Sequence, residues 1–531
     1  MKPDPVGAET VSAVAAEPAD LTAHASATSV AEELIDRGTG AISARAGRGV
    51  VLTLGSQWLK MVIQVASTIV VARLLSPRDY GLVGMVTALT GFADQLRDLG
   101  LSEASVQRDR LTRAQLDALF WLNTGLGGLF ALILCGVSPL VAQLYHRPEL
   151  TEVALVLSTN FIASGLAAQH TALLRRRLLF GRLALADVGS MALSIVVAIV
   201  AAAAGAGYWA LVAMYLTQTW ARLAIVWFRT DWWPRRPRRT QGVGELVSFG
   251  MHLSGFNVLN YVTRNLDNVL IGRYRGAIEL GLYTRAYALL MLPLRQLNSP
   301  IMRVAVPTLA GLRDQPNRFR AYYRSALVGL AATGMPAVVV LAVLSHEIVV
   351  MLLGGQYAGA APIFETLAIA GVAQVVSHTT GWLFIASSRT REMMRWGLIS
   401  GPVIVVAFLA GLSGGAVGVA RAYAIASLLL LVPGFWLATR NTPVSMVDVG
   451  AAVWRPAVVS GAIFAATLAA HAAVADRSDI VRFLVVVAVG IVVWVTGVWG
   501  WPTLRRDVNA LLFAMGRGLG RRGSPGRHAR R

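Results

Sequence analysis

Long apolar segments constrain the fold of this chain more than any other feature. A helix that crosses the hydrocarbon core of a bilayer needs about 20 mostly apolar residues. Only 14% of the 531 residues are charged, well below the roughly one quarter typical of a soluble domain. Fourteen segments have the required length and composition: 50–73, 80–101, 116–144, 150–173, 183–205, 207–228, 245–271, 280–311, 321–344, 359–386, 394–412, 415–438, 452–474 and 480–501. The sequence therefore predicts an all-α polytopic membrane protein with about 14 transmembrane helices.

Arginine clusters in the connectors support this count. Connectors after even-numbered segments carry arginines within 108–113, 175–182, 229–239 and 313–324, whereas connectors after odd-numbered segments are short and weakly charged. Cytoplasmic loops of membrane proteins carry an excess of Lys and Arg. The alternation therefore places both termini in the cytoplasm. It also explains the net charge of +20 without a nucleic-acid partner.

A repeated motif joins the first two segments of each half of the chain. The sequence VVARLLSPRDYGLVGM at 70–85 returns 200 residues later as LIGRYRGAIELGLYTR at 270–285. Both copies start from the same predicted side of the membrane, which indicates a parallel repeat. We expect two pseudo-symmetric six-helix lobes followed by a C-terminal helix pair. The offset pairs identical or similar residues at several positions, including Arg73 with Arg273, Asp79 with Glu279, and Gly81 with Gly281.

These patterns divide the chain into five parts. Residues 1–47 are rich in Ala, Glu, Thr and Ser and lack a continuous apolar core, which predicts a disordered cytoplasmic leader. The two lobes are expected at 48–240 and 241–440. Helices thirteen and fourteen are expected at 441–502, and a basic cytoplasmic tail at 503–531.

Several function classes are disfavoured by what the sequence lacks. Lys2 and Lys60 are the only lysines, and neither lies in a GxxxxGK[ST] loop, which disfavours nucleotide hydrolysis through a Walker motif. Cys135 is the only cysteine, so it forms no internal disulfide. The sequence contains no HExxH motif and no long outer connector for a catalytic domain. We therefore expect a transporter and not an enzyme, without a metal or cofactor.

Polar residues follow one face of the first segment. Ser56, Lys60, Gln64 and Ser67 recur at spacings of four, four and three residues, which places them on one helical face. A charged group at bilayer depth costs about 2.5 to 3.5 kcal/mol on the insertion scale, so such groups usually face a cavity or a partner. At the positions 200 residues later the seventh segment carries a second polar stripe: Asn260, Arg264 and Asp267.

We interpret these stripes as the lining of a cavity with surplus positive charge, suited to an anionic head group. The predicted substrate-binding residues are Lys60, Gln64, Arg264, Arg285 and Arg295. The candidates for ion coupling are Asp94, Asp267 and Glu365. One alternative is that the charges form internal ion pairs: Lys60 with Asp98, Arg97 with Asp94, and Arg264 with Asp267. Another is that Arg97 and Asp98 lie at the membrane interface.

Several longer motifs resemble one transporter family. ARLLSPRDYGLVGM is followed by GFADQLRDLGLSEASVQR at Gly91 to Arg108, and later by NVLIGRYRGAIELGLYTRAYALLMLPL at Asn268 to Leu294. Two further motifs are MLLGGQYAGAAPIFETLAIAG at Met351 to Gly371 and GWLFIASSRTREMMRW at Gly381 to Trp396. All of these motifs occur in this order over roughly residues 50 to 400. Together they resemble polysaccharide-exporter flippases of the Wzx or WzxC type, within the multidrug/oligosaccharidyl-lipid/polysaccharide (MOP) superfamily.

This resemblance implies a cargo and a location. Such flippases move oligosaccharide repeat units on undecaprenyl pyrophosphate across the bacterial inner membrane by alternating access, for exopolysaccharide or lipopolysaccharide export. The implied partners are the lipid-linked oligosaccharide, membrane lipid, a polysaccharide polymerase and a chain-length regulator. Two alternatives stay open: a cation-coupled multidrug exporter of the same superfamily, and a membrane-bound polymerase or glycosyltransferase.

Overall fold

The structure, a computed structural model, is built from helices. It describes residues 55, 57, 59–97, 112–236, 261, 265–502 and 504–506. Within these residues every regular element is a helix, and nine helical stretches are long and apolar enough to cross a membrane. The predicted all-α membrane fold is confirmed. The count of fourteen and the lobe boundaries stay predictions, and the leader lies outside the described residues.

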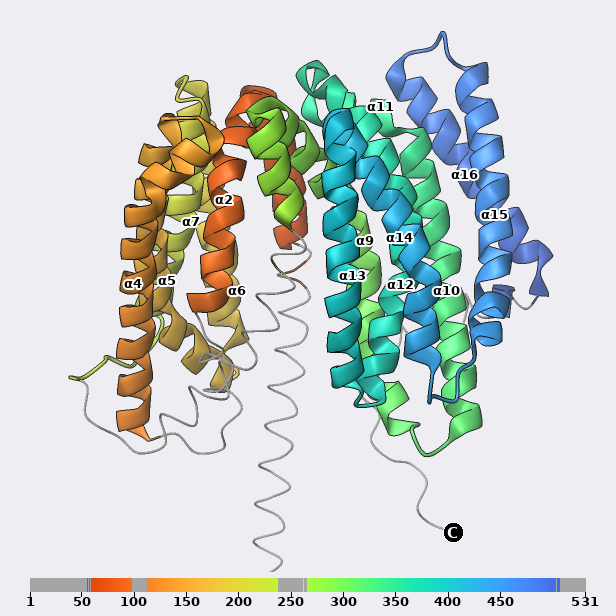
Figure 1. Cartoon of the computed structure of the whole chain (residues 1–531), viewed down its shortest axis with the longest axis horizontal. Coiled ribbons are helices and arrows are strands. Elements are labelled where there is room, and N and C mark those ends of the chain that lie inside the picture. The colour runs from red at the N-terminus through yellow and green to blue at the C-terminus, as the bar shows by residue number, and fades with distance from the viewer. Residues whose placement is uncertain are drawn as a thin grey trace, which may run out of the picture.

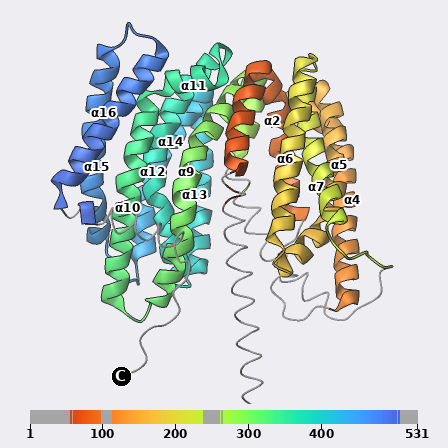
Figure 2. The same ribbon diagram turned by 180° about the vertical axis from the view of Figure 1, so that it is seen from behind.

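The helices form two groups, seen from opposite sides in Figures 1 and 2. The N-terminal bundle contains a helix at 59–74 and then α2 (Pro77–Arg97), α4 (Arg113–Tyr145), α5 (Glu149–Arg176), α6 (Phe180–Ala203) and α7 (Tyr208–Phe228). The C-terminal bundle contains a helix at 265–275 and then α9 (Ala277–Gly311), α10 (Pro316–Val343), α11 (Ser345–Leu353), η1 (Gly355–Ala360), α12 (Ala361–Ala386), α13 (Thr390–Gly411), η2 (Leu412–Gly414), α14 (Gly415–Thr439), α15 (Met446–Ala473) and α16 (Asp479–Gly500).

Glycines with positive φ angles lie at two tight turns between helices. Gly205 and Gly207 separate α6 from α7 with φ angles of +80° and +55°. Gly415 begins α14 with a φ of +66°. Glycine adopts positive φ without the steric cost of a Cβ atom. Both turns therefore lie where the apolar runs are interrupted by glycine.

The two copies of the repeat meet where α2 packs against α9. A Cβ atom on Gly81 would lie 1.7 Å from the carbonyl oxygen of Ala277. A Cβ atom on Gly281 would lie 1.8 Å from the carbonyl oxygen of Pro77. Each glycine thus allows the backbone of the opposite helix to approach, which no other residue type would permit. The paired glycines of the repeat thus form one close backbone contact between the bundles.

A second set of contacts joins the bundles beside this crossing. Arg73 Nη2 donates a hydrogen bond to the carbonyl oxygen of Met351, at the end of α11, over 2.6 Å. Gln356 Nε2 and Tyr357 Oη, both in η1, donate to the carbonyl oxygen of Leu75 over 3.1 and 2.9 Å. The sequence predicted only a connector here, whereas α11 and η1 reach across to the other bundle. We call the region where α2, α9, α11 and η1 meet the closed end.

The last two helices, α15 and α16, pack as a pair against α10. A buried carboxylate in the short helix α11 holds the pair in place. Glu347 Oε1 accepts hydrogen bonds from His471 Nε2 over 2.8 Å and from Arg482 Nη1 over 3.2 Å. Burial alone would raise the pKa of Glu347, but the His471 hydrogen bond and the Arg482 charge hold it below 4.5.

Replacing Glu347 with Gln is expected to lower the free energy of unfolding by about 2 kcal/mol at neutral pH, the usual range for hydrogen bonds to charged groups. A carboxylate whose pKa is lowered by folding stabilises the chain above its unfolded pKa and loses that contribution as pH falls through the folded pKa. The native chain should therefore lose more stability below pH 4.5 than the variant does. Thermal unfolding of detergent-solubilised protein at several pH values measures this. Asp476→Asn, on the exposed turn between α15 and α16, is the control, and equal pH profiles would contradict the assignment.

Candidate functional site

A cavity of about 350 Å³ lies between the two bundles, next to the closed end. Its walls come from the helix at 59–74, α2, α6 and α7 on one side, and from the helix at 265–275 and α9 on the other. We call it the inter-bundle cavity. Most polar residues that line it are neutral: Gln64, Ser67, Thr68, Tyr80, Thr87, Ser194, Tyr215, Gln218, Tyr261, Asn265, Asn268 and Thr284.

Arg285 carries the only charge among the described residues that line this cavity. Its guanidinium lies over the ring of Tyr80, 4.2 Å from the ring centroid. An aromatic face attracts a guanidinium by its quadrupole and does not neutralise it. The Nε atom of Arg285 is buried without a hydrogen-bond partner. The described walls of the cavity contain no acid, so the Arg285 guanidinium has no carboxylate partner there.

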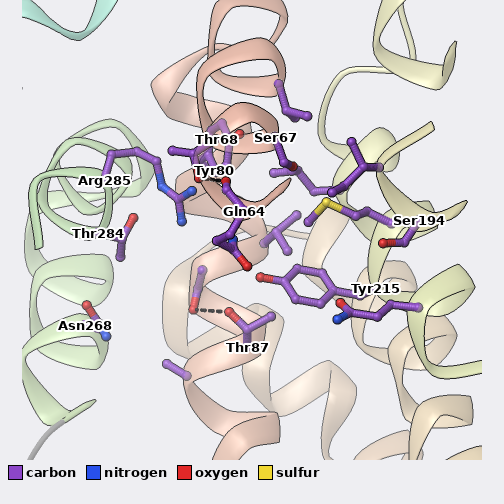
Figure 3. Close-up of a pocket in the computed structure, with 18 of the residues that line it drawn as sticks. Gln64, Ser67, Thr68, Tyr80, Thr87, Ser194, Tyr215, Asn268, Thr284 and Arg285 are labelled. Carbon is purple, nitrogen blue, oxygen red and sulfur yellow. Dashed lines mark hydrogen bonds between the residues drawn. The ribbon is translucent and has the colours of Figure 1, made fainter. Parts of the chain in front are cut away.

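Hydrogen-bonding groups face Arg285 across the cavity. Figure 3 shows Tyr215 entering from the N-terminal bundle and Arg285 entering from α9, with Gln64 between them. A guanidinium binds phosphate and carboxylate oxygens through paired N–H donors. Amides and hydroxyls both donate and accept hydrogen bonds, as sugar hydroxyls require. This arrangement suits a ligand with one anionic group attached to a polyhydroxylated part.

A second and larger cavity, of about 990 Å³, lies inside the C-terminal bundle between α9, α12, α13 and α14. We call it the C-bundle cavity. Two predicted site residues, Arg295 and Asp267, line it. Arg295 is exposed, whereas Asp267 is buried with 4% of its surface accessible. The structure thus distributes the predicted residues over two cavities.

Asp267 has its hydrogen bonds satisfied locally. One carboxylate oxygen accepts from Tyr283 Oη over 2.8 Å, and the other accepts from the backbone N–H of Asn268 over 2.7 Å. Arg264, its proposed ion-pair partner, lies outside the described residues. These bonds hold the residue in the wall between the helix at 265–275 and α9.

Lys60 lies at an ion-pair cluster in the N-terminal bundle and lines neither cavity. Its ammonium pairs with Asp187 of α6, whose other oxygen accepts from Arg222 Nε of α7 over 3.1 Å. Asp98, the partner considered from the sequence, lies outside the described residues. The carboxylate is shared by two cations, so the cluster keeps one net positive charge.

The structure does not place the other two candidates for ion coupling, Glu365 and Asp94, at either cavity. Glu365 is exposed on α12 and lines neither cavity. Asp94 belongs to α2, but its side chain lies outside what the structure describes. The role of both residues stays a prediction.

Sequence reasoning missed residues that the structure places at these sites. Tyr215, Gln218 and Arg222 recur at spacings of three and four on α7, the same stripe pattern that identified Gln64. Asp187 is the only acid in its apolar segment, a signal for a partner or a cavity. Tyr80 belongs to the repeat motif at 70–85, but nothing in the sequence indicates that its ring packs against the guanidinium of Arg285.

Solved structures show the same fold. A lipid II flippase, MurJ, in an inward closed conformation superposes with a TM-score of 0.69 at 13% identity, over 84% of this chain and 98% of that one. An inward-facing multidrug resistance MATE family transporter of the MOP superfamily gives a TM-score of 0.57 at 15% identity, over 73% and 94% of the two chains.

Curated relatives are similar along most of the chain. The teichuronic acid biosynthesis protein TuaB of Bacillus subtilis (strain 168) is 27% identical over 77% of this chain and 86% of its own length. The lipopolysaccharide biosynthesis protein WzxC of Escherichia coli (strain K12) is 24% identical over 69% and 75%. The succinoglycan biosynthesis transport protein ExoT of Rhizobium meliloti (strain 1021) is 25% identical over 63% and 71%.

A model of one protein family matches residues 70–362, which is more than half of the chain. The match begins at the first copy of the repeat and ends in the first turn of α12. It therefore includes the closed end and most of the inter-bundle cavity. On this match the chain belongs to the polysaccharide biosynthesis protein family.

Proposed function

We propose that the protein is a flippase for undecaprenyl-pyrophosphate-linked oligosaccharide repeat units, and that it works by alternating access. The observation that carries this proposal is the inter-bundle cavity, in which Arg285 is the one charge among the described lining residues and neutral hydrogen-bonding groups surround it. Arg285 binds the pyrophosphate in this scheme. The amide and hydroxyl groups bind the sugars.

The similarities support this assignment. ExoT is named as a transport protein for succinoglycan biosynthesis, and MurJ as a lipid II flippase. Each name refers to a polysaccharide or a lipid-linked precursor. The fold shared with MurJ contains two bundles with a cavity between them, which is the arrangement that alternating access requires.

We further propose that the protein lies in a bacterial inner membrane with both termini in the cytoplasm. The positive-inside pattern of the connectors supports this orientation. The closed end then faces the periplasm, so the structure represents a state closed on that side. A polysaccharide polymerase and a chain-length regulator are the expected protein partners, because they would use the translocated units.

The energy source in this scheme is an ion gradient or the membrane potential. Among Asp94, Asp267 and Glu365, Asp267 is the strongest candidate for ion coupling because its buried carboxylate lies beside a cavity. Its hydrogen bond from Tyr283 would have to change when a cation binds. The other two remain candidates from the sequence alone.

The two alternative functions fit the cavity less well. A cation-coupled drug exporter would need acidic or mainly aromatic walls, and the described lining of the inter-bundle cavity contains no carboxylate. A glycosyltransferase or polymerase would need acid–base groups beside its substrate. Arg285 is a poor general acid or base because a guanidinium stays protonated.

Reconstitution into vesicles tests the proposed function. A fluorescent lipid-linked oligosaccharide is placed in both leaflets, and a membrane-impermeant reagent that cleaves sugars measures how much is accessible from outside. Under an imposed ion gradient and membrane potential, vesicles with the protein should expose the whole pool within minutes, whereas empty vesicles should expose only the outer leaflet. Equal accessibility in both, ion-driven dye export, or new glycosidic bonds would each contradict the proposal.

A further inference from the structure

The ion-pair cluster around Lys60 belongs to three of the helices that line the inter-bundle cavity. It consists of Lys60 on the helix at 59–74, Asp187 on α6 and Arg222 on α7, and we call it the Lys60 cluster. The side chains of these residues are 31%, 29% and 37% exposed, respectively. None of the three is sealed inside the bundle, so a ligand can reach them.

Each member of the Lys60 cluster continues a row of side chains that lines the inter-bundle cavity. The positions four and seven residues away on the three helices all line it: Gln64 and Ser67, Met191 and Ser194, and Gln218 and Tyr215. Residues at these spacings share one face of a helix. The rows run toward the closed end, because a Cβ atom on Gly207, in the turn between α6 and α7, would lie 3.3 Å from Asp79 Oδ1. The cluster is therefore the next turn of the same three faces, on the side away from the closed end.

The cluster and Arg285 lie at different depths. At about 1.5 Å per residue, Lys60 is about 22 Å along its helix from Leu75 at the closed end. Arg285 is only about 12 Å along α9 from Ala277, which lies at the crossing of α2 and α9. A group that enters from the side away from the closed end therefore reaches the Lys60 cluster about 10 Å before it reaches Arg285.

The Lys60 cluster has positive charge and hydrogen-bond donors left for an anion. One oxygen of Asp187 pairs with the Lys60 ammonium, and the other accepts from Arg222 Nε over 3.1 Å. Among the residues that the structure describes, Asp187 is the only carboxylate paired with either cation. The Nη1 and Nη2 atoms of Arg222 donate to none of these residues, and an ammonium has three donors. Paired guanidinium N–H groups beside an ammonium suit a phosphate or pyrophosphate.

We propose that the Lys60 cluster is an entry site for the anionic head group of the cargo, and that Asp187 occupies the two cations when no cargo is bound. This inference rests on the proposed function. The phosphate oxygens bind Lys60 and the Nη edge of Arg222, while the like charge of the Asp187 carboxylate repels them. Asp187 thus keeps the first binding step weak enough for release. The head group then moves to Arg285, which meets no carboxylate in the described walls of the cavity.

Removing the acid and removing a cation should change the affinity for an anion in opposite directions. Inorganic pyrophosphate is titrated against detergent-solubilised full-length protein that carries Arg285→Gln, so that the deeper site is absent. Adding Asp187→Asn should tighten binding about tenfold, because a negative charge beside the ligand is removed. Adding Lys60→Gln or Arg222→Gln should weaken binding about tenfold, because a positive charge is removed.

A surface carboxylate supplies the matched control. Asp231 lies beyond the end of α7, is 80% exposed and pairs with Arg182, so Asp231→Asn removes the same charge from another ion pair and should leave the affinity unchanged. If the Lys60 cluster only holds helices together, the acid variant and the cation variants should all act in the same direction or not at all, and either result overturns the inference. Thermal unfolding of each variant confirms that it is folded.

Two further measurements separate the source of the anion and the proposed function. Phosphatidylglycerol carries a single phosphate charge and should compete poorly with pyrophosphate; competition at equal concentration would assign the cluster to membrane lipid and overturn the entry site. If the vesicle assay shows no transport but the affinity shifts have opposite signs, the proposed function fails and the anion site stands. If transport occurs but the Lys60, Asp187 and Arg222 variants all bind pyrophosphate equally, the inference fails and the proposed function stands.

Discussion

Leucine at Gly81 or Gly281 is expected to abolish transport by preventing the closed end from forming. A Cβ atom at either position would lie within 1.8 Å of a carbonyl oxygen on the opposite helix, about half the 3.4 Å at which ordinary van der Waals contact begins. The obstacle is backbone, so no rotamer change relieves it. Overpacking in a tight core costs about 1 to 3 kcal/mol or more, which shifts the closed population by roughly tenfold or more.

Thiol labelling measures this shift directly. Leu75 lies at the closed end with 2% of its surface exposed, so a Leu75→Cys reporter in a Cys135→Ala background should react slowly with a membrane-impermeant maleimide. Adding Gly81→Leu or Gly281→Leu should raise the labelling rate about tenfold or more. Gly136→Leu on α4 is the control, because its Cβ meets no atom within 4 Å. Slow labelling in the Gly81 and Gly281 variants would show that the closed end tolerates the side chain.

Arg285→Gln is expected to weaken binding of the lipid-linked cargo by about 10- to 100-fold and to slow transport in proportion. A hydrogen bond to a charged group contributes about 1.5 to 3 kcal/mol, and each 1.4 kcal/mol corresponds to tenfold in affinity. Arg285→Lys should keep part of the affinity, because an ammonium retains the charge but loses paired N–H donors. Binding titrations and the vesicle assay measure both effects.

A matched variant separates the local effect from a general loss of positive charge. Arg175 is exposed at the last turn of α5, so Arg175→Gln should transport at the native rate. Raising the salt concentration should weaken cargo binding by the native protein more than by Arg285→Gln, because salt screens the guanidinium charge. If Arg285→Gln transports the cargo at the native rate, Arg285 does not bind the anionic group of the cargo.

The position of Lys60 shows that a stripe of polar residues does not by itself identify the residues that line a cavity. Lys60 and Gln64 share one helical face, yet Gln64 enters the inter-bundle cavity and Lys60 pairs with Asp187. Spacing predicts that two side chains point the same way, but it does not say what lies opposite each of them. The ion-pair partner of Lys60 is Asp187 of α6, which lies more than 100 residues away in the sequence.

The sequence by itself determined the helical class, the main membrane segments and the register of the repeat. These follow from local properties: apolar length, glycine at turns, and residue pairs at a constant offset of 200. Observed helices such as α4 (Arg113–Tyr145) and α10 (Pro316–Val343) lie within a few residues of the predicted segments. Whether a helix can span a bilayer depends mainly on its own length and composition, so membrane segments can be predicted from the sequence.

Only the tertiary structure decided which repeat residues touch and which charges line a cavity. Gly81 and Gly281 align in the sequence, but their role comes from backbone approach between α2 and α9. Arg285 and Arg295 lie on one helix, yet they border different cavities. The physical reason is that a cavity is defined by several helices together, and their relative positions depend on packing contacts between residues distant in the sequence.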